Sequence, residues 1–197
     1  RLDDETDRDF HKALRCRADA VHDDRKTLLR IIHLFEVFEE MNIKLIVVGK
    51  SEEKYLCEAV DIYLKRLQHY VGFELVVLPD VKNAKSLPVG ELKDREAEMI
   101  LKQTAKADRV VLLDEKGKEF SSMEFSKYLE KQMNASVRML AFVVGGAFGF
   151  SDKVYEACKE RLSISRMTFS HQMIRLLFVE QLYRAFTIIK GEPYHNE

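Results

Sequence analysis

From residue 41 onward, two kinds of hydrophobic pattern alternate along the chain. Short runs rich in β-branched and other apolar residues, such as 43–48 and 73–78, are typical of buried strands. Between them, apolar residues recur every three or four positions over 52–70 and 92–106, which is the spacing of amphipathic helices. This alternation predicts an α/β fold with a mainly parallel sheet and helices on both of its faces.

The later part of the chain continues the same alternation. Strands are predicted at 109–113, 138–144 and 162–165, and helices over 151–159 and 170–190. Ser121 and Glu124 have the spacing of a capping box at the start of another helix, and Ser151 is the expected N-cap of the helix that follows it. Ligands of such sheets bind beyond the carboxyl ends of the strands, so a site is expected there.

The first forty residues do not follow this pattern. They contain no Gly and no Pro, and they carry eight basic and eleven acidic residues. Residues 27–40 have the spacing of an amphipathic helix. Either this segment packs on the domain as an appendage, or it is an extension and the native start is Met41. We favour the second interpretation, because residues 41–197 are enough for a complete domain.

Composition narrows the class of protein only in part. The chain of 197 residues is 46% hydrophobic, which is enough for one domain with a real core. Its formal net charge of −1 does not indicate a polycation, although residues 159–190 hold six basic and two acidic residues, a balance compatible with a polyanionic partner. The three cysteines form no CxxC pair, which argues against a disulfide framework and a thiolate metal site. There is no signal-peptide pattern and no run of ~20 apolar residues, so a cytoplasmic protein without a membrane segment is expected.

The stretch "FVVGGAFGF", residues 142–150, leads from a predicted strand into a glycine-rich turn. Glycine permits positive φ and close approach of the backbone to a ligand. The spacing matches neither G-x-G-x-x-G nor the P-loop pattern, which requires a lysine after the last glycine. The residues alone leave three interpretations open, namely a phosphate site, a site for another ligand, and a turn without function.

Three segments together resemble one family. They are "LLDEKGKEFSS" at 112–122, "FVVGGAFGFS" at 142–151 and "LSISRMTFSHQMIRLLFVEQLYRAFTIIKGEPYH" at 162–195. This combination resembles the bacterial ribosomal RNA large subunit methyltransferase H family, and the likeness covers residues 41–195 but not 1–40. The resemblance implies a SPOUT-class fold with a deep C-terminal trefoil knot, a homodimer, and methylation of ring nitrogen 3 of a pseudouridine in 23S rRNA within assembled ribosomes.

The resemblance also implies a site for S-adenosyl-L-methionine built from three loops. Many members of the family have a small or polar residue in place of Phe148 and a proline in place of Ser170, so the fine geometry of the loops is expected to differ here. Carried over residue by residue, the cofactor contacts fall on Leu113, Gly145, Ile164, Ser165, Arg166, Met167, Thr168 and Phe169.

Methyl transfer to nitrogen is an in-line displacement in which positioning supplies most of the catalysis, while the proton on ring nitrogen 3 needs an acceptor. His171 and Arg175 are four residues apart and are expected on one helix face, whereas Arg184 is about half a turn out of phase with Arg175. One helix cannot direct both arginines to one place, so in a dimer one of them is expected to serve the partner's site. The substrate-facing candidates are His171, Arg175, Arg184, Tyr194 and His195. For His171 the alternative is a structural role, and for Tyr194 and His195 it is a frayed tail.

The last helix, "MIRLLFVEQLYRAFTII", is apolar almost all round and must therefore be buried, for which a subunit interface is well suited. Glu180 and Arg184 have the spacing of a structural ion pair. Two other functions stay open beside the methyltransferase. One is a SPOUT-fold RNA-binding module without catalysis, and the other is a nucleotide-binding α/β protein whose Gly-Gly turn holds a phosphate.

Overall fold

A computed structural model describes residues 41–194, so the helix predicted at 27–40, the role of residues 1–40 and His195 lie outside the described residues. In chain order the elements are β1 (Asn42–Val48), α3 (Lys54–Leu67), β2 (Gly72–Leu78), the 3-10 turn η1 (Ala84–Ser86), α4 (Val89–Thr104), β3 (Arg109–Glu119), α5 (Ser122–Asn134), β4 (Met139–Val144), α6 (Asp152–Ala157), β5 (Glu160–Ser163) and α7 (Met173–Lys190).

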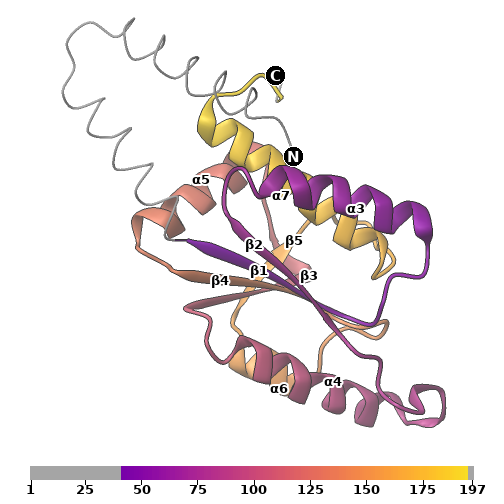
Figure 1. The fold of residues 1–197 in the computed structure, drawn as a ribbon. Coiled ribbons are helices and arrows are strands. Elements are labelled where there is room, and N and C mark those ends of the chain that lie inside the picture. Colours follow the sequence, from indigo (N-terminus) through magenta and orange to yellow (C-terminus); the bar gives the residue numbers. More distant parts are fainter. Residues whose placement is uncertain (1–40, 195–197) are drawn as a thin grey trace, which may run out of the picture. The chain divides into compact units, whose positions relative to one another are not determined.

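The strands form one five-stranded sheet in the order β2-β1-β4-β3-β5, and every neighbouring pair is parallel (Figure 1). The α/β prediction is therefore confirmed, and the sheet is parallel throughout. The central strands β1 and β4 are buried along most of their length, which explains why their sequences read as continuous apolar runs.

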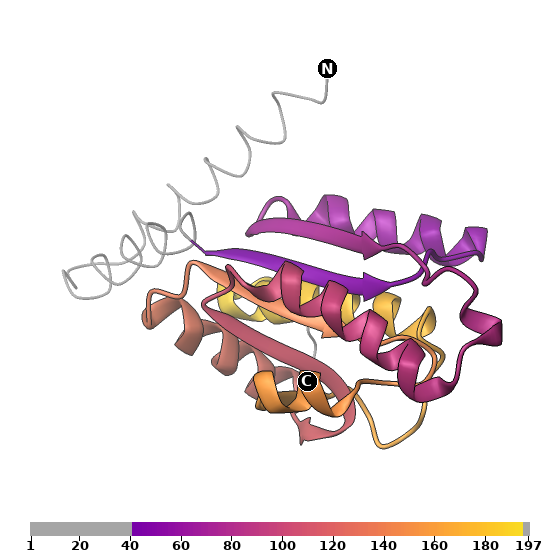
Figure 2. The ribbon, with the colours of Figure 1, turned by 90° about the horizontal axis from the view of Figure 1, so that it is seen from below.

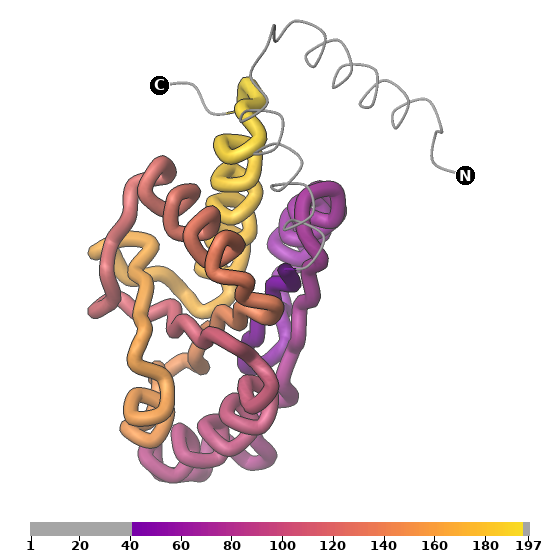
Figure 3. Tube along the Cα trace, turned by 90° about the vertical axis from the view of Figure 1, so that its left-hand side faces the viewer, coloured from indigo at the N-terminus to yellow at the C-terminus, as the bar shows by residue number. Residues whose placement is uncertain are grey.

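Helices cover both faces of the sheet. Helices α3, α5 and α7 lie on one face, and α4 and α6 lie on the other (Figures 1 and 2). Helix α7 runs between α3 and α5 and packs against both, as Figure 3 shows. Alternate residues of β4 serve the two layers, because Phe142 packs on Phe178 of α7 with ring centroids 4.7 Å apart, while Val143 belongs to the core beneath α4 and α6.

Strand β3 extends beyond the predicted end at residue 113. Its register against β5 shifts between Leu113 and Lys118, and pairing then resumes to Glu119. Gly117 lies within this irregular stretch, and a Cβ there would be 2.6 Å from the backbone of Leu162. Only glycine allows the two backbones to approach so closely.

Helix starts match the sequence only in part. The capping box of α5 is present, with Glu124 N–H donating to the Ser121 hydroxyl at 3.2 Å and Ser121 N–H donating to the Glu124 carboxylate at 2.8 Å. Ser151 precedes α6 as predicted, but its hydroxyl makes no capping bond. Helix α7 begins at Met173, three residues later than predicted, because the Ser170 hydroxyl accepts the Met173 N–H at 3.2 Å and residues 164–172 stay irregular. Among the described helices, none is long and apolar enough to cross a membrane.

Candidate active site

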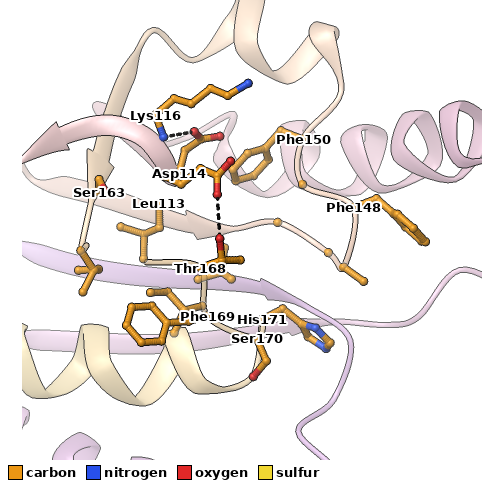
Figure 4. A pocket seen from close by; sticks show the side chains of 18 of the residues that line it. Leu113, Asp114, Lys116, Phe148, Phe150, Ser163, Thr168, Phe169, Ser170 and His171 are labelled. Carbon is orange, nitrogen blue, oxygen red and sulfur yellow. Dashed lines mark hydrogen bonds between the residues drawn. The ribbon is translucent and has the colours of Figure 1, made fainter. Parts of the chain in front are cut away.

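A pocket of about 680 Å³ lies beyond the carboxyl ends of β3, β4 and β5 (Figure 4). Three segments that are far apart in the sequence form most of its wall, namely 113–116, 144–150 and 162–171, and side chains from α4, α6 and α7 complete it. The volume is in the usual range for sites that hold a small molecule or cofactor. The position agrees with the rule that parallel sheets bind ligands at their carboxyl edge.

Most of the predicted cofactor residues meet at this pocket. Arg166 is the exception, because its side chain is 90% exposed and its Nε donates to the Glu119 carboxylate at 3.0 Å, away from the cavity. The residues that do line the pocket are Leu113, Gly145, Ile164, Ser165, Met167, Thr168 and Phe169.

The inner wall of the pocket is apolar. Leu113 and Phe150 are buried, and Ile164 and Phe169 are half-buried. The Phe150 ring packs edge-on against Tyr155 with centroids 5.8 Å apart, which holds both rings in place. A wall of this kind suits a flat heteroaromatic ring.

The glycine-rich loop closes tightly on itself. A Cβ on Gly145 would stand 3.2 Å from the Gly149 carbonyl carbon and 3.3 Å from the Phe150 ring. Gly149 has a φ of +73°, a conformation that favours glycine, and its N–H donates to the Gly146 carbonyl at 3.0 Å. The glycines are therefore required by the turn, and they also leave the backbone of the loop open to a ligand.

Two acidic side chains, Asp114 and Glu115, lie at the entrance of the pocket and accept hydrogen bonds from neighbouring segments. Asp114 accepts hydrogen bonds from the Lys116 N–H at 2.8 Å and from the Tyr155 hydroxyl. Burial and the bond to Asp114 raise the pKa of Tyr155 to about 12. Glu115 accepts the Thr168 hydroxyl at 3.3 Å, a contact drawn in Figure 4 that ties the 164–169 segment to the end of β3.

Asp114, Phe150 and Tyr155 line the pocket but were not among the predicted site residues. For Asp114 a signal existed, since it directly follows an apolar strand at the expected edge of the sheet. For the two aromatic residues there was none, because only the packing of α6 brings Tyr155 to the cavity.

His171 lines the pocket, whereas Arg175 does not. Burial first, and then the positive charge of Arg175, lower the pKa of His171, so its imidazole is held in the neutral form. Arg175 is only 3% exposed, and its guanidinium donates to the Val48 carbonyl at 2.6 Å and the Ser51 hydroxyl at 3.0 Å. It therefore links the end of β1 to the start of α7.

Arg184 and Tyr194 lie at the other end of α7. The predicted ion pair is present, with Arg184 Nη2 at 2.7 Å from the Glu180 carboxylate. The Arg184 guanidinium also lies over the Tyr194 ring at 4.8 Å, and the Tyr194 hydroxyl donates to Glu180 at 3.2 Å. Ten residues of helix separate Arg184 from Ile174 in the pocket wall, which is about 15 Å of axial rise. Within one protomer these side chains do not line the pocket.

Comparisons with known proteins agree with this geometry. A family model described as "Predicted SPOUT methyltransferase" matches residues 41–195. A curated protein of Parabacteroides distasonis is 56% identical over 157 residues, covering 80% of this chain and 100% of the relative. One of Christiangramia forsetii is 52% identical over 156 residues, covering 79% of this chain and 99% of the relative. Both relatives are named "Ribosomal RNA large subunit methyltransferase H".

The parallel sheet, the pocket at its carboxyl edge and the family match define the class as SPOUT methyltransferases. Within that class, the chain belongs to the ribosomal RNA large subunit methyltransferase H family. The resemblance seen in the sequence is thereby confirmed.

Proposed function

We propose that this chain uses S-adenosyl-L-methionine to methylate ring nitrogen 3 of a pseudouridine in 23S rRNA, in the cytoplasm and on assembled ribosomes. One observation carries the proposal. Three loops that the family resemblance assigns to the cofactor line a single pocket, in a chain that is 56% identical to a relative named ribosomal RNA large subunit methyltransferase H over that relative's whole length.

The residues of the pocket suit this cofactor better than a phosphate. The adenine ring would lie against Leu113 and Phe169, with the open backbone at Gly145 beside it. The charged residues of the lining are Asp114, Glu115 and Asp152 against Lys93 and Lys116, so acidic groups outnumber basic ones. This balance favours a cofactor that carries a sulfonium and an ammonium group over a phosphate.

When bound, S-adenosyl-L-methionine supplies an electrophilic methyl group. The chain's own contribution is to position the acceptor base and to take its proton. The neutral imidazole of His171 in the pocket wall is our candidate for the proton acceptor. Arg175 acts as a positioning residue, because its bonds to Val48 and Ser51 hold the start of α7 where His171 needs it.

Phe148 is our candidate contact for the RNA base. It lies in the glycine-rich loop, is 56% exposed, and extends away from the loop at the rim of the pocket (Figure 4). Met167, which is 72% exposed, adds a second apolar side chain to the pocket lining. RNA bases that are taken out of a helix stack on exposed aromatic rings, so Phe148 would serve as a platform beside the methyl group.

The proposal includes a homodimer. Helix α7 is apolar on nearly every side, yet Leu176, Leu177, Ile188 and Ile189 are only half-buried in the single chain. A second copy packed on this helix would bury them. It would also allow Arg184, Tyr194 and His195 to reach the pocket of the partner.

We also propose the C-terminal trefoil knot of the family. The path of the chain supports it. The chain leaves the sheet at the edge strand β5 and then returns as α7 to the middle of the helix layer that holds α3 and α5. An experimental structure in which the chain is traced and its ends are closed tests the knot directly.

Two measurements test the proposed function. Calorimetry should show micromolar binding of S-adenosylhomocysteine and no binding of ATP; the reverse preference would favour a phosphate site. Mass spectrometry of 23S rRNA should show that a pseudouridine methylated in the parent strain loses its methyl group in a deletion strain and regains it with this chain. If the chain bound the cofactor and RNA but the deletion strain kept its methylated pseudouridine, the chain would be an RNA-binding module without catalysis.

A further inference from the structure

Glu96 of α4 is a buried carboxyl group without a hydrogen-bonding partner. It is 8% exposed, and neither of its oxygens accepts a hydrogen bond from any residue between 41 and 194. Its oxygens keep some contact with solvent, because they are not among the fully buried side-chain atoms that lack a partner in residues 41–194. Glu96 is therefore a mostly buried carboxyl group that no donor of the described chain holds.

The carboxyl group is pressed against the glycine-rich loop. Its two oxygens lie 2.5 and 2.6 Å from the place where a Cβ on Gly146 would stand. Gly146 itself lines the candidate cofactor pocket, as do its neighbours Gly145 and Ala147. The backbone at Gly146 thus separates the Glu96 carboxyl from the cavity, and any side chain at residue 146 would displace that carboxyl.

The charges around Glu96 leave it without a counter-ion. Asp80, which follows β2, approaches Gly49 in the same way, with Oδ1 2.6 Å from the Cβ position of that glycine. Burial and then the charge of Asp80 raise the pKa of Glu96, and Lys93 on the same helix opposes them. His171 and Arg175 lie near Asp80, from the side of α7. None of these residues forms an ion pair with Glu96 among the described residues.

We propose that the Glu96 carboxylate is a specificity-determining group that favours the positively charged sulfonium cofactor over its neutral thioether product. The inference rests on the proposed function. Methyl transfer breaks the sulfur–methyl bond and leaves its electron pair on sulfur, so the sulfonium loses its positive charge. A buried anion close to the pocket attracts the cofactor before transfer and loses that attraction afterwards, which favours release of the product.

The same arrangement couples binding of the cofactor to loss of a proton from the Glu96 carboxyl group. In the free protein the carboxyl group is protonated to a higher pH than an ordinary glutamate, and a bound sulfonium favours its ionised form. At pH values near or below the pKa of Glu96, binding of S-adenosylmethionine therefore releases a proton from this carboxyl group, whereas binding of S-adenosylhomocysteine does not. The preference for the sulfonium form increases as the pH rises through the pKa of Glu96.

Calorimetry on the full chain tests this with both ligands and three proteins: wild type, Glu96→Gln and the control Glu98→Gln, which removes the same charge from the exposed side of α4. Glu96→Gln should weaken S-adenosylmethionine binding by about tenfold, because it removes the attraction between one negative charge and the sulfonium. It should leave S-adenosylhomocysteine within about twofold, and Glu98→Gln should change neither ligand.

Titrations of the wild type in buffers of different ionisation enthalpy count the released proton, so the proposal stays testable even if Glu96→Gln fails to fold. Equal weakening of both ligands would overturn the proposal and make Glu96 a support for the loop. An equal proton count for the two ligands would also overturn it. Absence of binding of either ligand to the wild type would instead refute the proposed function.

Discussion

The two ends of helix α7 use similar residues in different ways. At the start of the helix, Arg175 is buried and directs its donors to Val48 and Ser51 of the same chain. Near the end, Arg184 lies half-buried on the surface, where it pairs with Glu180 and stacks on Tyr194. The first arginine holds the fold beside the pocket, and the second lies on a surface outside the pocket described above.

In the proposed homodimer, one helix would contribute to two sites. The start of α7 lies at the carboxyl edge of the sheet, where the pocket is, because residues 164–172 lead directly from β5 into it. Arg184 lies about 15 Å away from Ile174 along the axis, so it would be useful to catalysis only if a second copy brings a pocket to it.

The largest expected effect is at the pocket. Replacing Gly145 with valine places a Cβ 3.2 Å from the backbone of Gly149 and adds two methyl groups at the cofactor wall. We expect calorimetric affinity for S-adenosylhomocysteine to fall by more than about 100-fold, because overpacking is not relieved where the neighbour is backbone.

The matched control is Gly90→Ala, since nothing lies within 4 Å of a Cβ at that position. It should bind the ligand like the wild type. Both variants should show a cooperative thermal unfolding transition. Wild-type affinity in the folded Gly145→Val protein would remove the glycine loop from the cofactor site.

Mixed dimers test whether Arg184 of one subunit serves the pocket of the other subunit. Gly145→Val and Arg184→Met are each expected to be nearly inactive as homodimers. A heterodimer purified with two different tags has one intact pocket facing one intact Arg184, so it should recover about half of the wild-type methylation rate. An inactive heterodimer would mean that Arg184 acts within its own chain.

The two arginines should differ in their effect on stability. Arg175→Met leaves the buried Val48 carbonyl without its donor and should lower the free energy of unfolding by about 3 kcal/mol. Arg184→Met removes a half-buried i,i+4 ion pair and should cost about 1 kcal/mol or less. Urea denaturation at equal protein concentration measures both, and equal losses would contradict the distinction between the two ends.

His171 should make the protein sensitive to acid. Burial and Arg175 lower its pKa in the folded state below the ordinary 6.5. The stability that comes from keeping the imidazole neutral is therefore complete above pH 6.5, and it is lost as the pH falls from there through the folded-state pKa.

Urea denaturation between pH 7 and pH 5 should show this loss in the wild type and a smaller loss in His171→Asn. The acidic limb of kcat/KM should likewise lie below pH 6.5 in the wild type, because the neutral imidazole persists there. An acidic limb that is unchanged in His171→Asn would exclude His171 as the proton acceptor.

The smallest effect is expected at Arg166. Its side chain is 90% exposed and bonded to Glu119, so Arg166→Ala should change affinity for S-adenosylhomocysteine by less than about twofold. Calorimetry beside the wild type measures this. A tenfold loss would show that the guanidinium turns into the pocket when the ligand binds.

Seven of the eight residues that the family resemblance assigned to the cofactor line the pocket. The sequence by itself determined the layered α/β fold and nearly every strand and helix. It could do so because buried parallel strands and amphipathic helices have characteristic periods, and because strand ends of a parallel sheet lie on one edge. The capping box at Ser121 is equally local, since it depends only on two residues three positions apart.

Only the tertiary structure decided what the polar residues of these elements do. Arg175 and His171 have the spacing of a shared helix face, but α7 begins later, and burial commits Arg175 to the end of β1. Glu96 reads as one acidic residue among several on an amphipathic helix, and only packing places it against Gly146. The physical reason is that hydrogen bonds and charge interactions depend on the few neighbours that distant segments bring within reach, which local patterns do not encode.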